Sequence, residues 1–145
     1  SQTLNTAVRS CDKISIAAVN GVAIQTGMSL ALACDFRIAA QSARLGSATL
    51  RFGLLPDEGG QYLLVQLIGV AKTLDFLINK KIATADECLE LGLVHEVVPN
   101  DDLGARALAF AGDLLPSLTG VHHRPRPYSS HTTTDCRLVA LSRVQ

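Results

Sequence analysis

Two adjacent carboxylates, Asp57 and Glu58, stand in a short apolar segment, residues 54–60, with the sequence Leu-Leu-Pro-Asp-Glu-Gly-Gly. A carboxylate set against an apolar pocket formed by residues such as Ile24, Phe52 and Leu54 has a raised pKa, which suits it to abstract a proton. Asp57 also precedes two glycines and a helical run, where carboxylates are favoured as helix caps. The two roles are compatible, and the residues alone leave both open.

A second candidate for chemistry is the loop that ends at Gly27 and leads into a helix. Residues 28–34, Met-Ser-Leu-Ala-Leu-Ala-Cys, are small or apolar on every side, which predicts a helix buried in the core. The first N–H groups of such a helix lack intrahelical partners, and the helix dipole adds positive potential there. One such donor typically stabilises a developing oxyanion by ~2.7–4 kcal/mol. Alternatively, Gly21 and Gly27 only shape a tight turn.

Alternating strands and helices must position these groups. Residues 14–19 predict a strand buried on both faces, and residues 36–39 a second strand, so the helix between them implies a parallel crossover. Residues 22–27 and 52–56 are expected to be loops. The pattern predicts further strands at 43–46 and 93–98, helices at 4–11, 61–68, 71–77 and 103–115, and a helix that begins at the Thr84–Glu87 capping box and ends at Gly92.

The fold class is therefore α/β, with one core over residues 1–120. From residue 121 the chain is rich in His, Pro, Ser and Thr and follows neither the helical nor the strand period. This composition, together with the lack of a helical or strand period, predicts that residues 121–145 form an irregular or disordered tail.

Composition excludes several classes of function. The chain has 145 residues, 48% of them hydrophobic, and its 13 basic and 13 acidic residues balance. A balanced charge provides no basic face for nucleic acid, and the apolar stretches are interrupted before the ~18–20 residues of a membrane span. No signal peptide is recognisable at Ser1. A small anionic ligand remains possible.

Cysteine and histidine give no metal-site pattern. The four cysteines, Cys11, Cys34, Cys88 and Cys136, lack CxxC spacing and lie in apolar or helical contexts, which favours reduced, structural thiols and a cytoplasmic or organelle-matrix location. Three of the four histidines lie in the tail without fixed spacing. The fourth, His95, lies in an alternating strand pattern and is expected to be structural. We therefore predict no metal and no cofactor.

Residues 16–35, from Ile-Ala-Ala-Val-Asn-Gly to Ala-Cys-Asp, resemble the signature of the crotonase (enoyl-CoA hydratase/isomerase) superfamily. Residues 52–60 and 83–94 resemble two further motifs of that superfamily in the same order, so the resemblance covers about residues 4–115. It implies a partial ββα spiral core that lacks the family's N-terminal half and C-terminal helices. It also implies an acyl-CoA thioester as substrate, fatty acid metabolism, and a homo-oligomer, which is a trimer or hexamer in the family.

The resemblance also implies roles for single residues. The second oxyanion donor of the family falls on Thr26, where a glycine is usual, with Gly27 beside it, and Ile24 and Leu54 fall on substrate-binding positions. The first donor belongs to the part of the family fold that is absent here, so the chain alone is expected to be inactive.

The two glutamates of the family's hydratases fall on Ser29 and Thr49, whose hydroxyl groups cannot activate water as carboxylates do. Asp57 matches the proton-carrying aspartate of the family's acyl-CoA isomerases, with Glu58 as a second candidate base. The pattern favours enoyl-CoA isomerisation. There are two alternatives. One is an acyl-CoA-binding relative without catalytic activity, and the other is an enoyl-CoA hydratase, on the basis of family resemblance alone.

Overall fold

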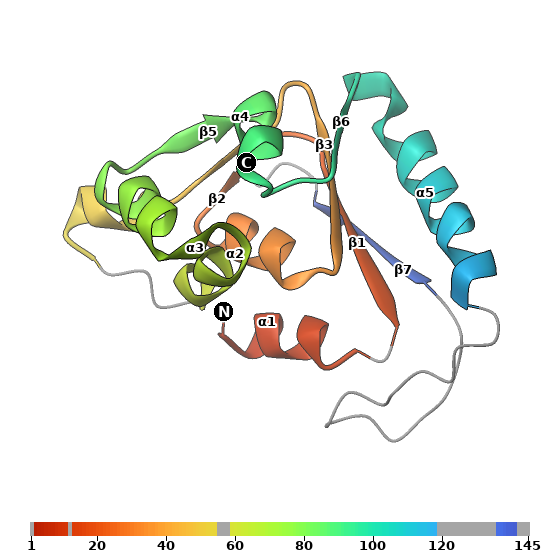
Figure 1. Ribbon diagram of the computed structural model, residues 1–145, viewed down its shortest axis with the longest axis horizontal. Coiled ribbons are helices and arrows are strands. Elements are labelled where there is room, and N and C mark those ends of the chain that lie inside the picture. Colours follow the sequence, from red (N-terminus) through yellow and green to blue (C-terminus); the bar gives the residue numbers. More distant parts are fainter. Residues whose placement is uncertain (1, 12, 55–58, 119–135, 142–145) are drawn as a thin grey trace.

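The computed structural model describes residues 2–11, 13–54, 59–118 and 136–141. Two sheets carry the fold (Figure 1). In the larger sheet the strand order is β6 (Glu96–Val98), β3 (Phe36–Ala40), β1 (Ile14–Val19) and β7 (Cys136–Leu141), with every pair parallel. In the smaller sheet β2 (Val22–Ile24) pairs in parallel with β4 (Arg44–Gly46), which pairs antiparallel with β5 (Ile82–Thr84).

Helices surround the two sheets (Figure 1). They are α1 (Gln2–Arg9), α2 (Thr26–Ala33), α3 (Gly60–Ile78), α4 (Ala85–Leu91) and α5 (Leu103–Leu118), with 3-10 turns η1 (Thr49–Phe52) and η2 (Asn100–Asp102). The mixed α/β architecture confirms the predicted fold class.

Strand β1 is buried on both faces, as its continuous apolar sequence predicts. Ile16 and Ala18 pack in one hydrophobic cluster with Leu103 of α5. Ala17 and Val19, whose side chains point to the opposite face, pack in the cluster that contains α2. Because β1 and β3 are parallel neighbours, α2 is the crossover between them, as predicted.

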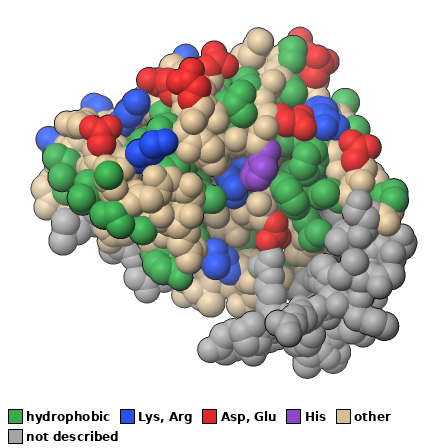
Figure 2. Space-filling model, viewed as in Figure 1, with side chains coloured by type: hydrophobic (Ala, Val, Ile, Leu, Met, Phe, Trp, Pro, Cys, Tyr) green, Lys and Arg blue, Asp and Glu red, His purple; other side chains and the backbone are tan. Residues whose placement is uncertain are grey.

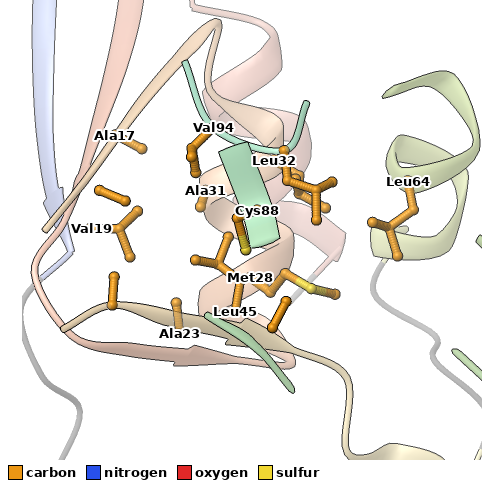
Figure 3. Close-up of a cluster of buried hydrophobic side chains, with 14 of the residues drawn as sticks. Ala17, Val19, Ala23, Met28, Ala31, Leu32, Leu45, Leu64, Cys88 and Val94 are labelled. Atoms are coloured by element: carbon orange, nitrogen blue, oxygen red, sulfur yellow. The ribbon is translucent and has the colours of Figure 1, made fainter. Parts of the chain in front are cut away.

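Helix α2 lies inside the larger cluster rather than on the surface. Met28, Leu45 and Cys88, from α2, β4 and α4, lie close together there (Figure 3). Each is at most 2% exposed. The small sheet and α4 therefore close over the side of α2 that faces away from the large sheet.

Helix α3 is broken at Gly69, whose φ of 77° and ψ of 168° are not helical. This is the predicted boundary between two helical runs. Helix α3 has 19 residues and a mean hydropathy of 1.3, so by length and composition alone it could cross a membrane. Both halves nevertheless bury apolar side chains in the core, Leu64 in the first and Phe76 in the second.

The outer face of α3 remains apolar. Its exposed large hydrophobic side chains are Tyr62, Val65, Leu67, Val70, Leu74 and Ile78. Hydrophobic side chains gather on the side of the molecule where α3 lies, with Lys and Arg side chains beside them (Figure 2).

The predicted capping box of α4 is present. Glu87 N–H donates to Thr84 Oγ1 at 3.2 Å, and Thr84 N–H donates to the Glu87 carboxylate at 2.8 Å. Gly92 ends the helix with a φ of 78°. The box therefore fixes where β5 ends and α4 begins.

Three segments differ from the sequence expectations. Residues 22–24, expected in a loop, form β2, and residues 82–84 form β5, because both strands are three residues long and too short to show a period. Within the expected irregular tail, Cys136–Leu141 form β7, a run with strand-like apolar residues that pairs with β1. Residues 121–135 and 142–145 of that tail lie outside the described residues.

Arg37 is buried in β3, only 3% exposed, and its side chain ties two elements together. Its guanidinium donates to the Cys34 carbonyl at the end of α2 and to the Leu93 carbonyl after α4, both at 2.7 Å. A cation at a helix C-terminus is favourable because the last carbonyls carry partial negative charge. Burial lowers the pKa of Arg37.

We expect Arg37→Met to lower the free energy of unfolding of the full-length protein by about 2–4 kcal/mol. The reason is that two buried carbonyls would lose their donors. Arg51→Met is the control, since Arg51 is exposed and donates to a surface carbonyl of Lys80. Urea denaturation should show a much smaller change for the control, and equal changes would contradict the structural role of Arg37.

His95 joins the turn before β6 to β3, in agreement with the structural role expected for it. Its Nδ1 accepts the Arg37 N–H at 3.1 Å, and its own N–H donates to the Arg37 carbonyl at 2.9 Å. The imidazole also lies against the Phe36 ring, with centroids 5.2 Å apart. Burial, and then the Arg37 charge, lower the pKa of His95.

Because the folded pKa of His95 is lowered, the unfolded chain binds the proton more readily. The His95 contribution to stability should be present above the unfolded pKa of about 6.5 and decline as the pH falls toward the lower folded value. The unfolding midpoint should therefore decrease as the pH is lowered from 7.5 to 5. In His95→Asn, which retains an acceptor without titrating, this decrease should be smaller, and an unchanged slope would contradict the assignment.

Candidate functional site

The first turn of α2 follows an unusual junction with β2. Gln25, between them, has φ 57° and ψ −108°, a conformation that side-chain-bearing residues rarely adopt. The first bond within the helix runs from Ser29 N–H to the Gln25 carbonyl at 2.9 Å. The N–H groups of Thr26 and Gly27 therefore precede the helical hydrogen-bond ladder.

Gln25 is held from both its backbone and its side chain. Its N–H donates to the Gly46 carbonyl at 3.0 Å, and its Oε1 accepts from Ser47 Oγ at 3.3 Å. Gly46 is closely packed, because a Cβ at this position would lie 2.8 Å from the Lys81 carbonyl oxygen. Strands β4 and β5 thus fix the loop that precedes α2.

Thr49, one of the two hydratase glutamate positions, begins η1. Its Oγ1 lies 3.4 Å from Ser47 Oγ, so Thr49 is linked through Ser47 to Gln25. Its carbonyl accepts the Leu54 N–H at 3.1 Å and fixes the end of η1. The structure therefore brings the Thr49 position to the loop before α2.

Ser29, the other glutamate position, is 2% exposed and packs against the start of α3. A Cβ placed on Gly60 would overlap Ser29 Oγ and lie 3.3 Å from Ser29 Cβ. Helices α2 and α3 approach closely at this point because one position is a glycine and the other is small.

The predicted apolar surroundings of Asp57 are only partly present. Ile24 is half-buried in β2, whereas Phe52 and Leu54 are 76% and 61% exposed. Those two side chains do not form the expected pocket, because no described element covers η1 on that side. Asp57 and Glu58 lie outside the described residues.

The polar row Gln25–Ser47–Thr49 was not anticipated from the sequence. Ser47 and Thr49 are two residues apart after a predicted strand, which is a weak signal. Their partner Gln25 is 22 residues away from Ser47 in the chain, and only the pairing of β2 with β4 brings the two together.

The cysteines are expected to be reduced and structural, and the structure agrees with this at Cys34 and Cys88. Cys34 and Cys88 are buried free thiols, and burial raises the pKa of each to about 11. Such thiols are protonated and unreactive at neutral pH. Over the described residues there is no group of three or more His, Cys, Asp or Glu side chains that could hold a metal ion.

A surface hollow of about 300 Å³ lies along α3. Its lining comes from α3, α4 and the turn between α3 and β5: Ala71, Lys72, Asp75, Phe76, Lys81 and Leu91. None of the predicted site residues that the structure describes borders it.

Known proteins resemble this chain in sequence. The sequence model of the enoyl-CoA hydratase/isomerase family matches residues 1–123. The peroxisomal fatty acid beta-oxidation multifunctional protein of Arabidopsis thaliana is 39% identical over 103 residues, which are 71% of this chain and 14% of that protein. The crotonyl-CoA hydratase of Syntrophomonas wolfei is 37% identical over 108 residues, 74% of this chain and 42% of that protein.

Solved structures show the same relationship. The enoyl-CoA hydratase of Bacillus anthracis superposes with a TM-score of 0.76 at 38% identity, over 78% of this chain and 44% of that one. A protein of Thermobifida fusca solved in complex with CoA gives a TM-score of 0.72 at 38% identity, over 75% of this chain and 42% of that one.

The fold and the matched motifs define a crotonase-type protein: the chain belongs to the enoyl-CoA hydratase/isomerase family. It spans less than half the length of each of these relatives. The predicted superfamily is therefore confirmed, as a portion of the family fold.

The close approach of Gly60 to Ser29 gives a testable constraint. Gly60→Ala should destabilise the full-length protein by about 1–3 kcal/mol, because the new methyl group would overlap Ser29 Oγ. Adding Ser29→Ala should recover part of the loss, with a coupling energy above about 0.5 kcal/mol in a double-mutant cycle.

Gly104→Ala in α5 is the matched control, since a Cβ there would meet no atom within 4 Å. Thermal unfolding of this variant should be unchanged or slightly raised. Additive effects of the Gly60 and Ser29 substitutions would contradict the packing described.

Proposed function

We propose that this protein binds an acyl-CoA thioester and transfers a proton between carbons of its enoyl chain through an enolate. Family membership supports acyl-CoA as the substrate class, and one relative was solved in complex with CoA. The observation that carries the isomerase-type chemistry is the pair of neutral hydroxyls, Ser29 and Thr49, at the positions of the hydratase glutamates. CoA enters as part of the substrate, and no other cofactor is proposed.

The first turn of α2 is the proposed oxyanion site. Its N–H groups, at Thr26 and Gly27, precede the first bond of a helix buried between the two sheets. Thr26 is exposed and Gly27 half-buried, so a ligand can reach this turn, and the positive potential of the helix N-terminus would there stabilise an enolate oxygen. The Cβ of Thr26, where glycine is usual, narrows the approach of the thioester carbonyl.

Asp57 is the proposed proton carrier. It stands three residues before Gly60, which packs against Ser29 in the same turn region of α2. Three residues of chain span at most about 11 Å, and this short separation from Gly60 supports Asp57 as a group that could reach the proposed oxyanion site. Glu58 is the second candidate base, and Ile24 and Leu54 are proposed to contact the acyl chain.

Hydration of the double bond is the competing activity, and the relatives' names favour it. Water addition needs a group that holds and activates water, which the hydroxyls of Ser29 and Thr49 do poorly at neutral pH. A protein that binds acyl-CoA without catalysis is the other alternative. We further propose that the protein is a homo-oligomer in the cytoplasm or an organelle matrix; one relative is named as a peroxisomal protein, which supports the second location.

Asp57→Asn should lower the exchange of α or γ hydrogens of an enoyl-CoA for deuterium by about 10²-fold or more, with affinity for the thioester retained. The measurement is mass spectrometry of the substrate incubated in D₂O with the full-length protein. Asp75→Asn is the control, because Asp75 lies on exposed α3 surface and pairs with Asn79.

Unchanged exchange in Asp57→Asn, with exchange lost in Glu58→Gln, would move the role to Glu58. No exchange in the unsubstituted protein despite acyl-CoA binding would favour the non-catalytic alternative. Stereospecific water addition as the main reaction would establish the hydratase instead.

A further inference from the structure

Gln25, the single residue between β2 and α2, has a backbone conformation that glycine would adopt without strain. Its φ of 57° and ψ of −108° are close to those of the first central residue of a type II′ turn, a position dominated by glycine. A residue with a Cβ is strained there, and such strain persists only where the surrounding structure holds it. Glutamine at this position therefore carries a strain that glycine would avoid.

The two peptide groups that flank Gln25 are both hydrogen-bonded. On one side the Gln25 N–H donates to the Gly46 carbonyl at 3.0 Å. On the other side the Gln25 carbonyl accepts the Ser29 N–H at 2.9 Å. Bonds to β4 and to α2 thus set both dihedrals of Gln25.

These dihedrals set the direction of the proposed oxyanion donor. The Gln25 carbonyl and the Thr26 N–H belong to one planar peptide group, in which they point in opposite directions. Because the carbonyl points along α2 toward Ser29, the Thr26 N–H points away from the helical ladder. A rotation at Gln25 would therefore turn the Thr26 N–H away from the place where a thioester oxygen is proposed to bind.

The Gln25 side chain adds a third connection. Its Oε1 accepts from Ser47 Oγ at 3.3 Å, and Ser47 is only 3% exposed. Little water competes for a hydrogen bond at a buried hydroxyl, so this contact ties Gln25 to the residue that follows β4. Glycine would make the two backbone bonds without strain, but it could not make this one.

We propose that Gln25 is a positioning residue for the proton transfer proposed above: its contact with Ser47 holds the Thr26 N–H in the direction that stabilises the enolate oxygen. The inference rests on the proposed function, and Gln25 acts through Thr26 without touching the substrate. The oxyanion develops in the transition state, so a misaligned donor lowers kcat more than it raises KM. A purely structural role of Gln25 would change stability and leave kcat as it is.

The test measures kcat and KM for deuterium incorporation into crotonyl-CoA and octenoyl-CoA by the full-length protein. Gln25→Gly removes the strain and the side-chain contact together. It should lower kcat by about tenfold or more, with KM within about threefold. Its melting temperature should lie within about 3 °C of that of the unsubstituted protein, or above it, because relief of strain offsets the lost contact. Gln25→Met, which has the same chain length but no acceptor, should show the same loss of kcat.

The contact is tested from its other side with Ser47→Ala, which removes the donor and should lower kcat to a similar extent. In the double variant of Gln25→Met with Ser47→Ala, kcat should be no lower than in either single variant, since all three lose the same contact. Ser42→Ala is the matched control, because it removes an exposed hydroxyl that contacts the Asn20 carbonyl, and it should leave kcat unchanged.

Unchanged kcat in Gln25→Gly and Gln25→Met would overturn the positioning role while leaving the proposed function intact. Additive losses in the double variant would also overturn it, as would a loss of kcat that follows the loss of melting temperature across the variants. If the unsubstituted protein exchanges no hydrogen, the proposed function itself fails, and the inference fails with it. The two Gln25 variants keep the test decisive should Ser47→Ala not fold.

Discussion

The burial of helix α2 is the constraint on which the rest of the structure depends. Its side chains are small and apolar on all sides, so the helix is stable only when both sheets, α3 and α4 close around it. Burial removes water from the C-terminal end of the helix, whose carbonyls must then find other partners, whereas at the N-terminal end Thr26 is exposed and Gly27 half-buried. The two ends of α2 have different surroundings.

The C-terminal end of α2 is satisfied within the protein, where the buried Arg37 guanidinium donates to the Cys34 carbonyl. The N-terminal end is oriented by Gln25 and by β4, through the bond from the Gln25 N–H to the Gly46 carbonyl and the contact of the Gln25 side chain with Ser47. One end of the helix therefore serves stability, while the other is the end at which the oxyanion site is proposed. The close contact between Ser29 and Gly60 sets the distance between α2 and α3 on that side.

Most elements that pack in the core could be predicted from the sequence. The apolar run of β1, the glycine-led buried helix and the Thr84 capping box each carry a local signal, because their residues satisfy the element within a few positions. Strands β2 and β5 carry no such signal, since three residues show no period and their pairing with β4 defines them.

The polar contacts of the site were harder to predict, for the same reason. No pattern in the sequence identifies the partners of Arg37, which are carbonyls, one of them 56 residues away. The Gln25–Ser47 contact depends on the register of β2 with β4, which no local pattern gives. Motif positions could thus be assigned from sequence, whereas the bonds that orient them could not.

The neutral residues at positions 29 and 49 also change the electrostatics of the α2 turn. A carboxylate at either position would offset part of the positive potential of the helix N-terminus. Hydroxyl groups leave that potential in place, so a negative charge that develops on a ligand is the one that balances it. In the proposed mechanism, this site stabilises an enolate rather than activating water, and its proton carrier comes from another segment of the chain. Residues 55–58 contain the two carboxylates proposed for that role, Asp57 and Glu58.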